Sequence, residues 1–213
     1  MKDTKERLLT IATRLFAVCG YEGVSTRELA RRAGVNLSAI TYYFGSKREL
    51  YNAVIARAGE EIGKTFPSFG NLADAGALTP AEAGRELKAL LGRLFIFLCE
   101  SGLSDDMAGL VLRELMHPTE AYGRIYAGVF EPVHKKLCAL AGKAADLPAD
   151  SPETLILAHT LLGQVFIFRL HREILLRRLG IGGYDEKMHS EILRVVYRNC
   201  DAVLKAAKEA RDA

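Results

Sequence analysis

The N-terminal part of the chain repeats apolar positions with the spacing of an amphipathic helix. Within residues 4–19 an apolar stripe recurs every three or four positions, at Leu8, Ala12, Leu15 and Phe16. Side chains at this spacing lie on one face of a helix, so the stripe is predicted to face a core. Gly20 follows, where a left-handed residue commonly ends a helix. The pattern therefore predicts a first helix over 4–19.

A second helix is predicted over 26–33. Ser25 stands three residues before Glu28, which is the spacing of a capping box, and Gly34 follows the last helical position. Its buried face is expected to consist of Leu29, Ala30 and Ala33. The start and stop signals thus bound an eight-residue helix on both sides.

A third, very short helix is predicted over 37–44. Asn36 is a favoured N-cap residue, and Gly45 ends the segment. Ile40 and Phe44 are four positions apart, so both are expected to point inward. The remaining positions of this helix are then left for solvent or for a partner.

The rest of the chain keeps the helical spacing. A fourth helix starts after Ser46 and presents Leu50, Val54 and Ala58 to the same core, and a loop rich in Pro and Gly follows over 66–80. Further helices are predicted over 81–101, 105–117, 119–143 with a kink at Pro132, 152–179 and 185–211. No strand alternation or βαβ rhythm occurs, so the predicted fold class is all-α.

Composition and charge narrow the class of protein. The N-terminal MKDTKERLL is too charged for a signal peptide, and Arg169 interrupts the longest apolar stretch, so we expect a soluble cytoplasmic protein with no membrane span. The net charge of +3 is unevenly distributed. Residues 1–52 hold nine Lys and Arg against five Asp and Glu, so the basic excess sits at one end, as expected if that end meets a polyanion.

Chemistry-bearing motifs are scarce. The sequence lacks HExxH, GxSxG, Walker A and Gly-rich dinucleotide motifs, so we expect no enzyme activity and no cofactor. The four cysteines form no CxxC pair, and we interpret them as reduced thiols. His134 and Cys138 have metal-ligand spacing, but a plain helix surface explains them better, and we expect no metal site.

The segment 26–44 has the layout of a helix-turn-helix, in which the second helix enters the major groove. Its turn, 34–36, contains a glycine, and the major groove is wide enough for one helix. With Ile40 and Phe44 inside, the outer face of the second helix carries hydroxyls and two tyrosines, Tyr42 and Tyr43. At least one of these tyrosines is expected to reach DNA.

Residues at helix starts are predicted to hold the phosphate backbone. Thr26 and Arg27 open the second helix and Lys47 opens the fourth. Helix N-termini add free N–H groups and a partial positive charge at these positions. Arg31, Arg32 and Arg48 are equally well interpreted as solvated surface charges.

The run LFAVCGYEGVSTRELARRAGVNLSAITYYFGSKRELYNAVI resembles the DNA-binding domain of TetR-family transcriptional regulators. The shared features are GYEGVST, ELAxxAGV, the paired tyrosines before a phenylalanine, and SKREL. The resemblance implies a DNA-binding domain at 1–64 and a helical effector-binding and dimerisation domain at 65–213. The candidate DNA-binding residues are Thr26, Arg27, Asn36, Ser38, Ala39, Thr41, Tyr42, Tyr43 and Lys47. The segment LVLRELMHPTEAY further resembles the CecR-like subfamily.

Polar residues set into apolar stretches are candidates for an effector pocket, because burial without a partner is costly. For each one, a satisfied internal hydrogen bond is the more common explanation, and a ligand contact is the alternative. With one aromatic neighbour, the candidates are Arg113, Glu114, His117, His159, Gln164, Phe166 and Arg169. The expected partner is a small molecule that releases the protein from DNA. The alternative is an effector-independent DNA-binding protein controlled by a protein partner.

A homodimer is expected, because one short reading helix contacts too few base pairs for tight specific binding. We call each DNA-binding domain with its reading helix a reading head. Two reading heads related by a two-fold axis double those contacts and require a pseudo-palindromic operator. The two last predicted helices are apolar over more than one face. Their candidate interface residues are Leu155, Leu162, Leu170, Ile174, Val196, Tyr197 and Leu204. The family resemblance favours repression over activation.

Overall fold

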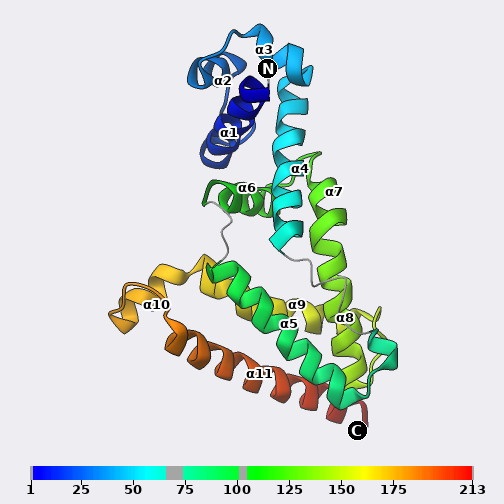
Figure 1. The fold of residues 1–213 in the computed structure, drawn as a ribbon. Helices are drawn as coiled ribbons and strands as arrows, with labels where there is room; N and C mark the ends of the chain where they lie inside the picture. The colour runs from blue at the N-terminus through cyan, green and yellow to red at the C-terminus, as the bar shows by residue number, and fades with distance from the viewer. Residues whose placement is uncertain (1, 66–73, 101–104, 213) are drawn as a thin grey trace. The chain divides into compact units, whose positions relative to one another are not determined.

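The computed structural model describes residues 2–65, 74–100 and 105–212, and every regular element in that part of the chain is helical (Figure 1). The elements are α1 (Lys2–Cys19), α2 (Thr26–Ala33), α3 (Ser38–Phe44), α4 (Lys47–Thr65), η2 (Ala75–Ala77), α5 (Pro80–Glu100), α6 (Asp105–Met116), α7 (Tyr122–Ile125), the π-helical turn η3 (Tyr126–Phe130), α8 (Glu131–Ala145), α9 (Pro152–Leu170), α10 (Arg172–Leu179) and α11 (Glu186–Asp212). The all-α prediction is confirmed. Parts of the predicted 66–80 loop lie outside the described residues.

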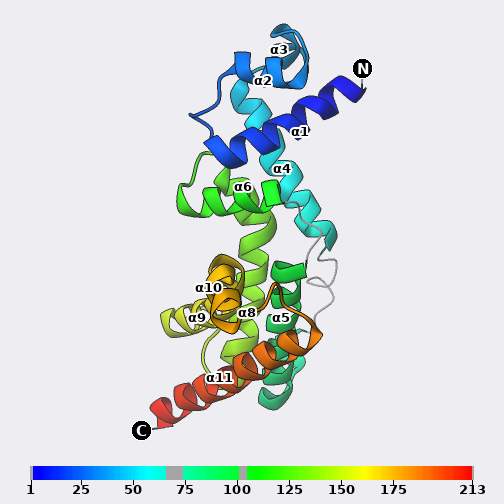
Figure 2. The same cartoon turned by 90° about the vertical axis from the view of Figure 1, so that its left-hand side faces the viewer.

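The chain forms two compact units. The first contains the described parts of 1–66 and 102–131, and the second those of 67–101 and 132–213. The first unit therefore adds α6, α7 and η3 to the four N-terminal helices, and Figure 2 shows α6 beside α1 as Figure 1 does. The sequence places the boundary between the DNA-binding and effector-binding domains at residues 64 and 65. This functional boundary differs from the division into compact units and stays a prediction.

The core of the first unit follows the predicted apolar stripes. The predicted residues with less than a tenth of their surface exposed are Leu8, Ala12, Phe16, Leu29, Ala30, Ala33, Ile40, Leu50, Val54 and Ala58. Leu15 and Phe44 are only half-buried. Phe44 ends the seven-residue α3, and Lys5 Nζ lies 5.7 Å from its ring centroid, so this ring faces a charged side chain at the edge of the core.

Helix caps in the first unit match the sequence signals. The Glu28 N–H donates to Ser25 Oγ at 3.1 Å, and the Glu49 N–H donates to Ser46 Oγ at the same distance. Gly34 ends α2 with φ of +63°, a left-handed conformation that is energetically unfavourable for any residue that has a Cβ atom. These caps fix where α2 ends and α4 begins, and so fix both ends of the segment that carries α3.

The predicted helix over 119–143 is interrupted. Helical structure resumes only at Tyr122, because the Ala121 N–H donates to Thr119 Oγ1 in the preceding turn. The predicted irregularity at Pro132 is present as the π-helical turn before it, in which the Glu131 N–H donates to the Tyr126 carbonyl. Proline lacks an N–H and clashes with the carbonyl four residues back, and a wider turn relieves both problems.

The second unit packs α5, α9 and α11 around a shared apolar core. Phe95 of α5 meets Phe168 of α9 edge to face, with ring centroids 5.7 Å apart. Lys88 of α5 is paired with Asp201 of α11 at 2.7 Å. A Cβ at Gly92 would collide with the Tyr197 hydroxyl, so this glycine allows α5 and α11 to approach closely.

The predicted single helix over 152–179 is wrong, because it breaks at His171 between α9 and α10. The Phe168 carbonyl accepts a hydrogen bond from the Tyr184 hydroxyl at 3.4 Å, and Arg172 lies over the Tyr184 ring. His171 has left helical geometry, with φ −112° and ψ 27°. The break coincides with a contact to a residue 16 positions away, which helical periodicity does not reveal.

Among the described helices, α9 is long and apolar enough to cross a membrane by length and composition. Core and interface helices of soluble proteins pass the same test. Only 28% of the apolar window is buried inside the chain, and Ile156, Ile167 and Leu170 are exposed on α9. The four cysteines are free thiols.

Candidate DNA-binding site

The outer face of α3 is open and carries the residues predicted to read DNA. Tyr42 is 72% exposed, Thr41 and Ser38 are exposed, and Ile40 on the opposite face is only 2% exposed. Tyr43 is half-buried, and its ring meets that of Tyr42 edge to face at 4.9 Å. The α3 segment therefore presents hydroxyls and one largely exposed aromatic ring from a helix anchored by a buried isoleucine.

Asn36 sets the start of this helix. Its Oδ1 accepts hydrogen bonds from the Ser38 N–H at 3.0 Å and from the Ser38 hydroxyl at 3.1 Å. The cap fixes the helix start and the orientation of the first outer side chain together. The role of Asn36 in the structure is thus to position Ser38, while its amide N–H₂ stays available to an acceptor.

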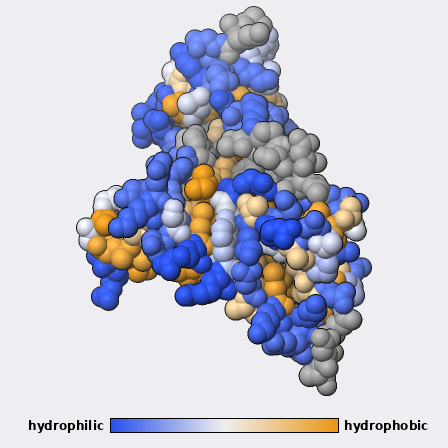
Figure 3. Space-filling view, turned by 60° about the horizontal axis from the view of Figure 1, so that its bottom comes forward, coloured by the Kyte–Doolittle hydropathy of each residue, from blue (hydrophilic) through white to orange (hydrophobic). Residues whose placement is uncertain are grey.

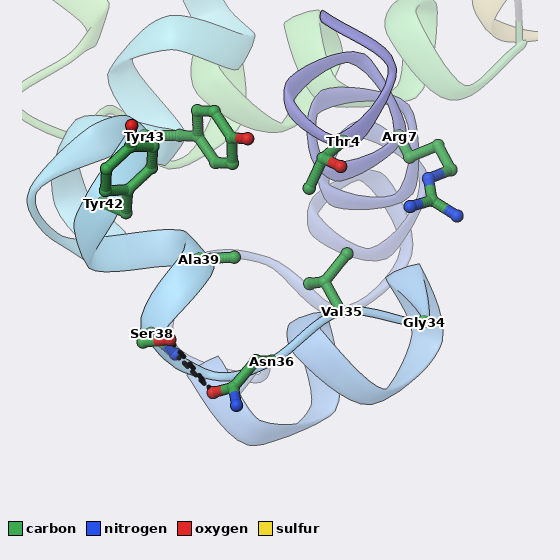
Figure 4. A pocket seen from close by; sticks show the side chains of 9 residues that line it. All are labelled: Thr4, Arg7, Gly34, Val35, Asn36, Ser38, Ala39, Tyr42 and Tyr43. Atoms are coloured by element: carbon green, nitrogen blue, oxygen red, sulfur yellow. Dashed lines mark hydrogen bonds between the residues drawn. The ribbon is translucent and has the colours of Figure 1, made fainter. Parts of the chain in front are cut away.

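A cleft of about 480 Å³ lies beside α3 (Figure 4). One wall is the reading helix, and the other is formed by α1 and by the turn between α2 and α3. The lining residues are Thr4, Arg7, Gly34, Val35, Asn36, Ser38, Ala39, Tyr42 and Tyr43. Thr4 and Arg7 were absent from the predicted site. The sequence signal that would have suggested Arg7 is its position as a basic residue near the start of a helix in the basic part of the chain.

Two of the predicted phosphate clamps begin α2, and the third begins α4. Thr26 is half-buried and Arg27 is exposed. Lys47 is half-buried, and its Nζ lies 4.2 Å from the Tyr21 ring centroid, a cation–π contact that orients the ammonium group. Sequence reasoning did not find Tyr21, because its contact with Lys47 joins positions 26 residues apart.

Arg31 and Arg32 are held by a carboxylate. Both guanidinium groups donate to Glu28, at 2.7 Å and 2.8 Å. These hydrogen bonds lower the pKa of Glu28 to about 2, first through Arg31 and then through Arg32. The charge of the two arginines is therefore partly compensated inside α2, unlike that of Arg27.

Two family models cover most of the chain. The model of bacterial regulatory proteins of the TetR family matches residues 8–54, and the model of the C-terminal domain of the HTH-type transcriptional dual regulator CecR matches residues 83–207. The chain belongs to the CecR-like branch of the TetR family. It is a transcriptional regulator with a helix-turn-helix DNA-binding domain, as the resemblance implied.

One relative and two solved structures are similar to this chain over most of its length. The dual regulator CecR of Shigella flexneri is 29% identical over 211 residues, covering 98% of this chain and 94% of that protein. A candidate fatty acid metabolism regulator from Clostridium perfringens is 22% identical, with a TM-score of 0.63, covering 90% of this chain and 97% of that one. AibR, solved with isovaleryl coenzyme A and operator DNA, is 15% identical with a TM-score of 0.61, covering 91% and 96%. The two structures share the fold.

Three of the predicted effector residues of this TetR-family chain lie in the first unit, where two have internal partners. Arg113 donates to the carbonyls of Ala17 and Val18 at the C-terminal end of α1, at 3.4 Å and 2.9 Å. Glu114 is fully buried and accepts hydrogen bonds from Tyr51 and Thr119. Both residues therefore hold helices together, and we leave them out of the proposed effector site. His117 is exposed.

The other predicted effector residues lie on α9 in the second unit. His159 is exposed, and its ring centroid lies 5.7 Å from that of His134. Burial lowers the pKa of His134, and the nearby charge of His159 lowers it further. Gln164 accepts a hydrogen bond from Asn199 at 3.3 Å. Phe166 and Arg169 are half-buried. The described residues contain no group of three or more His, Cys, Asp or Glu arranged to hold a metal ion.

The predicted interface residues separate into two groups by exposure. Val196 and Leu204 of α11 are 2% and 8% exposed, so they belong to the core of the second unit and are not available to a partner. Tyr197 is half-buried with its hydroxyl beside Gly92. The residues with accessible surface are Leu155, Leu162, Leu170 and Ile174.

Proposed function

We propose that this chain is a cytoplasmic repressor that binds a pseudo-palindromic operator as a homodimer and is released by a small-molecule effector. The observation that carries the DNA-binding part is the open face of α3, with Tyr42 72% exposed on a helix pinned by Ile40. Exposing an aromatic ring to water on so short a helix has no stabilising value for the monomer. In a major groove the same ring gains contacts with bases or sugars.

The exposed apolar face of α9 and α10 supports the proposed dimer. Ile156, Ile167 and Leu170 lie on one side of α9 and are 64%, 42% and 49% exposed, and Ile174 on α10 is 62% exposed. Figure 3 shows apolar surface over the α10 region, at the left of that view. Large open apolar surfaces mark sites of association. A second copy of the chain would cover this face and pair two reading helices for two operator half-sites.

The effector is proposed to bind the second unit through the predicted residues that keep accessible polar or aromatic groups there, namely His159, Gln164, Phe166 and Arg169. Binding is proposed to change the separation of the two reading helices. An effector that favours the released state about 100-fold per site shifts a dimer by about 10⁴, which is enough to empty an operator. AibR, crystallised with an acyl coenzyme A and its operator, supports this type of partnership.

Selection from a random duplex pool with the purified full-length protein tests the proposal. The expected product is an inverted repeat whose half-sites lie about one helical turn, roughly 34–36 Å, or a multiple of it, apart. In vitro transcription from a promoter carrying that repeat should fall as protein is added. Recovery of no enriched sequence would contradict specific DNA binding.

A second experiment separates repression from effector release. A small-molecule library is screened for compounds that weaken binding to the selected duplex, with binding to a scrambled duplex as the control. A true effector should weaken specific binding and also raise the melting temperature of the free protein, because it binds the folded state. Failure to find any such compound in a library that includes acyl thioesters would argue against effector release while leaving DNA binding intact.

A further inference from the structure

We infer that α1 supplies a second set of DNA contacts, in which Arg7 binds a backbone phosphate and Thr4 assists it. The inference deepens the proposed function and rests on it, because it assigns new residues to the same DNA-binding site. It starts from the cleft beside α3, whose walls include both of these α1 side chains (Figure 4).

The lining of the cleft has the chemistry of a phosphate site. Four side-chain hydroxyls, one amide and one guanidinium line it, and no carboxylate does. The four hydroxyls belong to Thr4, Ser38, Tyr42 and Tyr43. Guanidinium and hydroxyl donors are the groups that most often bind phosphate oxygens in protein–DNA complexes. The cleft is therefore suited to a phosphodiester segment.

Arg7 is free to take up such a ligand. Its nearest carboxylate is Asp3, at 3.8 Å from Nε, and the two side chains are 50% and 84% exposed. An open pair at that distance contributes little, so exchanging Asp3 for a phosphate costs little. Arg14, on the same helix, is closer to its partner, with Nε 3.4 Å from Asp106.

The dimensions of the groove bring DNA backbone to this wall. An α-helix with its side chains is about 10–12 Å across, and the major groove is about 12 Å wide. A reading helix seated in the groove fills it, so the elements flanking α3 face the phosphates at its edges. The N-terminal turns of α1 flank α3 in this way, and Lys5 ties them to the end of α3 through its contact with the Phe44 ring.

The test compares Arg7→Ala with Arg14→Ala in the full-length protein. Both variants remove one exposed arginine from α1, so they change helix propensity and net charge equally. Dissociation constants are measured by fluorescence anisotropy over a salt series, for the selected duplex and for a scrambled duplex of equal length. Circular dichroism melting checks that both variants are folded, and Arg7→Lys tests whether a positive charge restores binding.

For Arg7→Ala we expect binding to both duplexes to weaken on the order of tenfold, the loss expected for a charge-assisted hydrogen bond. The slope of log K against log salt should become shallower by about one for each reading head. Arg14→Ala should match wild type, and Arg7→Lys should recover most of the slope. Thr4→Ala should give a smaller loss with an unchanged slope.

Equal slopes for Arg7→Ala, Arg14→Ala and wild type would overturn the inference. If Tyr42→Ala still altered sequence preference in the same assay, the reading helix and the proposed function would stand without α1. A wild-type protein that bound the selected and scrambled duplexes equally weakly would overturn the proposed function and this inference together.

Discussion

Glu114 is a carboxylate with no exposed surface, and it joins three parts of the first unit. Its oxygens accept hydrogen bonds from Tyr51 of α4, from the Thr119 N–H at 3.2 Å and from the Thr119 hydroxyl at 3.0 Å. The neighbouring Arg113 binds two carbonyls at the end of α1. Two adjacent residues on α6 therefore hold the C-terminal end of α1 and the N-terminal part of α4.

Tyr51→Phe tests this network. The change removes one donor to a buried carboxylate, and we expect it to lower the free energy of unfolding by about 1–3 kcal/mol. Urea unfolding followed by circular dichroism measures it. Tyr42→Phe removes the same hydroxyl from a 72% exposed ring and should leave stability within about 0.5 kcal/mol of wild type. Equal unfolding midpoints for the two variants would contradict a structural role for the Tyr51 hydroxyl.

Burial and the hydrogen bond to Glu114 both raise the pKa of Tyr51 above its usual value. The neutral phenol is therefore favoured in the folded chain. Its contribution to stability is fully present below the pKa of the unfolded tyrosine and declines as the pH rises above it. Tyr51→Phe should thus flatten the alkaline limb of the stability profile.

The pKa of Glu28 is shifted in the opposite direction to that of Tyr51. Its pKa is lowered to about 2 by Arg31 and then by Arg32, against an ordinary value of about 4.3. Its contribution is therefore present above pH 4.3 and is lost as the pH falls through about 2. An NMR titration of the Glu28 carboxyl is expected to give a midpoint well below the ordinary value of about 4.3. A Glu28 midpoint at the ordinary value would show that the contacts with Arg31 and Arg32 do not form in solution.

Among the elements, the caps and apolar stripes of α2, α3 and α4 followed directly from the sequence. α2 and α3 are short and end at a glycine, and α4 begins after the capping Ser46, so local chemistry decides these boundaries. The break at His171 and the late start of α7 were missed. The break depends on a hydrogen bond from the Tyr184 hydroxyl, 16 positions away, and the late start on the Thr119 side chain, which also donates to the buried Glu114.

The residues of the candidate site were likewise predictable from the sequence only in part. The residues on α3 and at the starts of α2 and α4 were predictable, because helical periodicity identifies an outer face. The α1 wall of the cleft was not, because a helix crossing beside α3 is a matter of packing. Arg113 and Glu114 were assigned to a pocket because they are polar residues in an apolar stretch. That pattern signals burial, but it does not distinguish an internal partner from a ligand.

The reading face and the clamps should respond differently to substitution. Thr41→Ala and Tyr42→Ala are expected to change the selected sequence, with a loss of about 1–3 kcal/mol at each contacted base pair. Arg27→Ala and Lys47→Ala should weaken binding to all duplexes and make the salt slope shallower by about one per head. Repeating the selection with each variant and measuring salt series distinguishes the two classes. If the four variants behaved alike, the division into reader and clamps would be wrong.

In the chain as a whole, the basic excess and the apolar helix α9 lie in different parts of the sequence. The excess of Lys and Arg lies within residues 1–52, whereas the apolar window of α9 is only 28% buried. A monomer gains nothing from leaving an apolar helix open to water. The proposed dimer would cover that face and double the number of basic reading heads on one DNA molecule, so a single assembly would account for both features.

Ile167→Glu should dissociate that dimer. The side chain is 42% exposed on α9, so the free subunit tolerates a carboxylate there, whereas a dimer interface would have to bury an unpaired charge at a cost of several kcal/mol. Sedimentation equilibrium should show a shift from dimer to monomer, and binding to the inverted repeat should fall far more than binding to a single half-site. Val18→Glu, at a 69% exposed position on α1, provides the matched control and should remain dimeric. A dimeric Ile167→Glu protein would place the interface elsewhere and leave the open face of α9 for another partner.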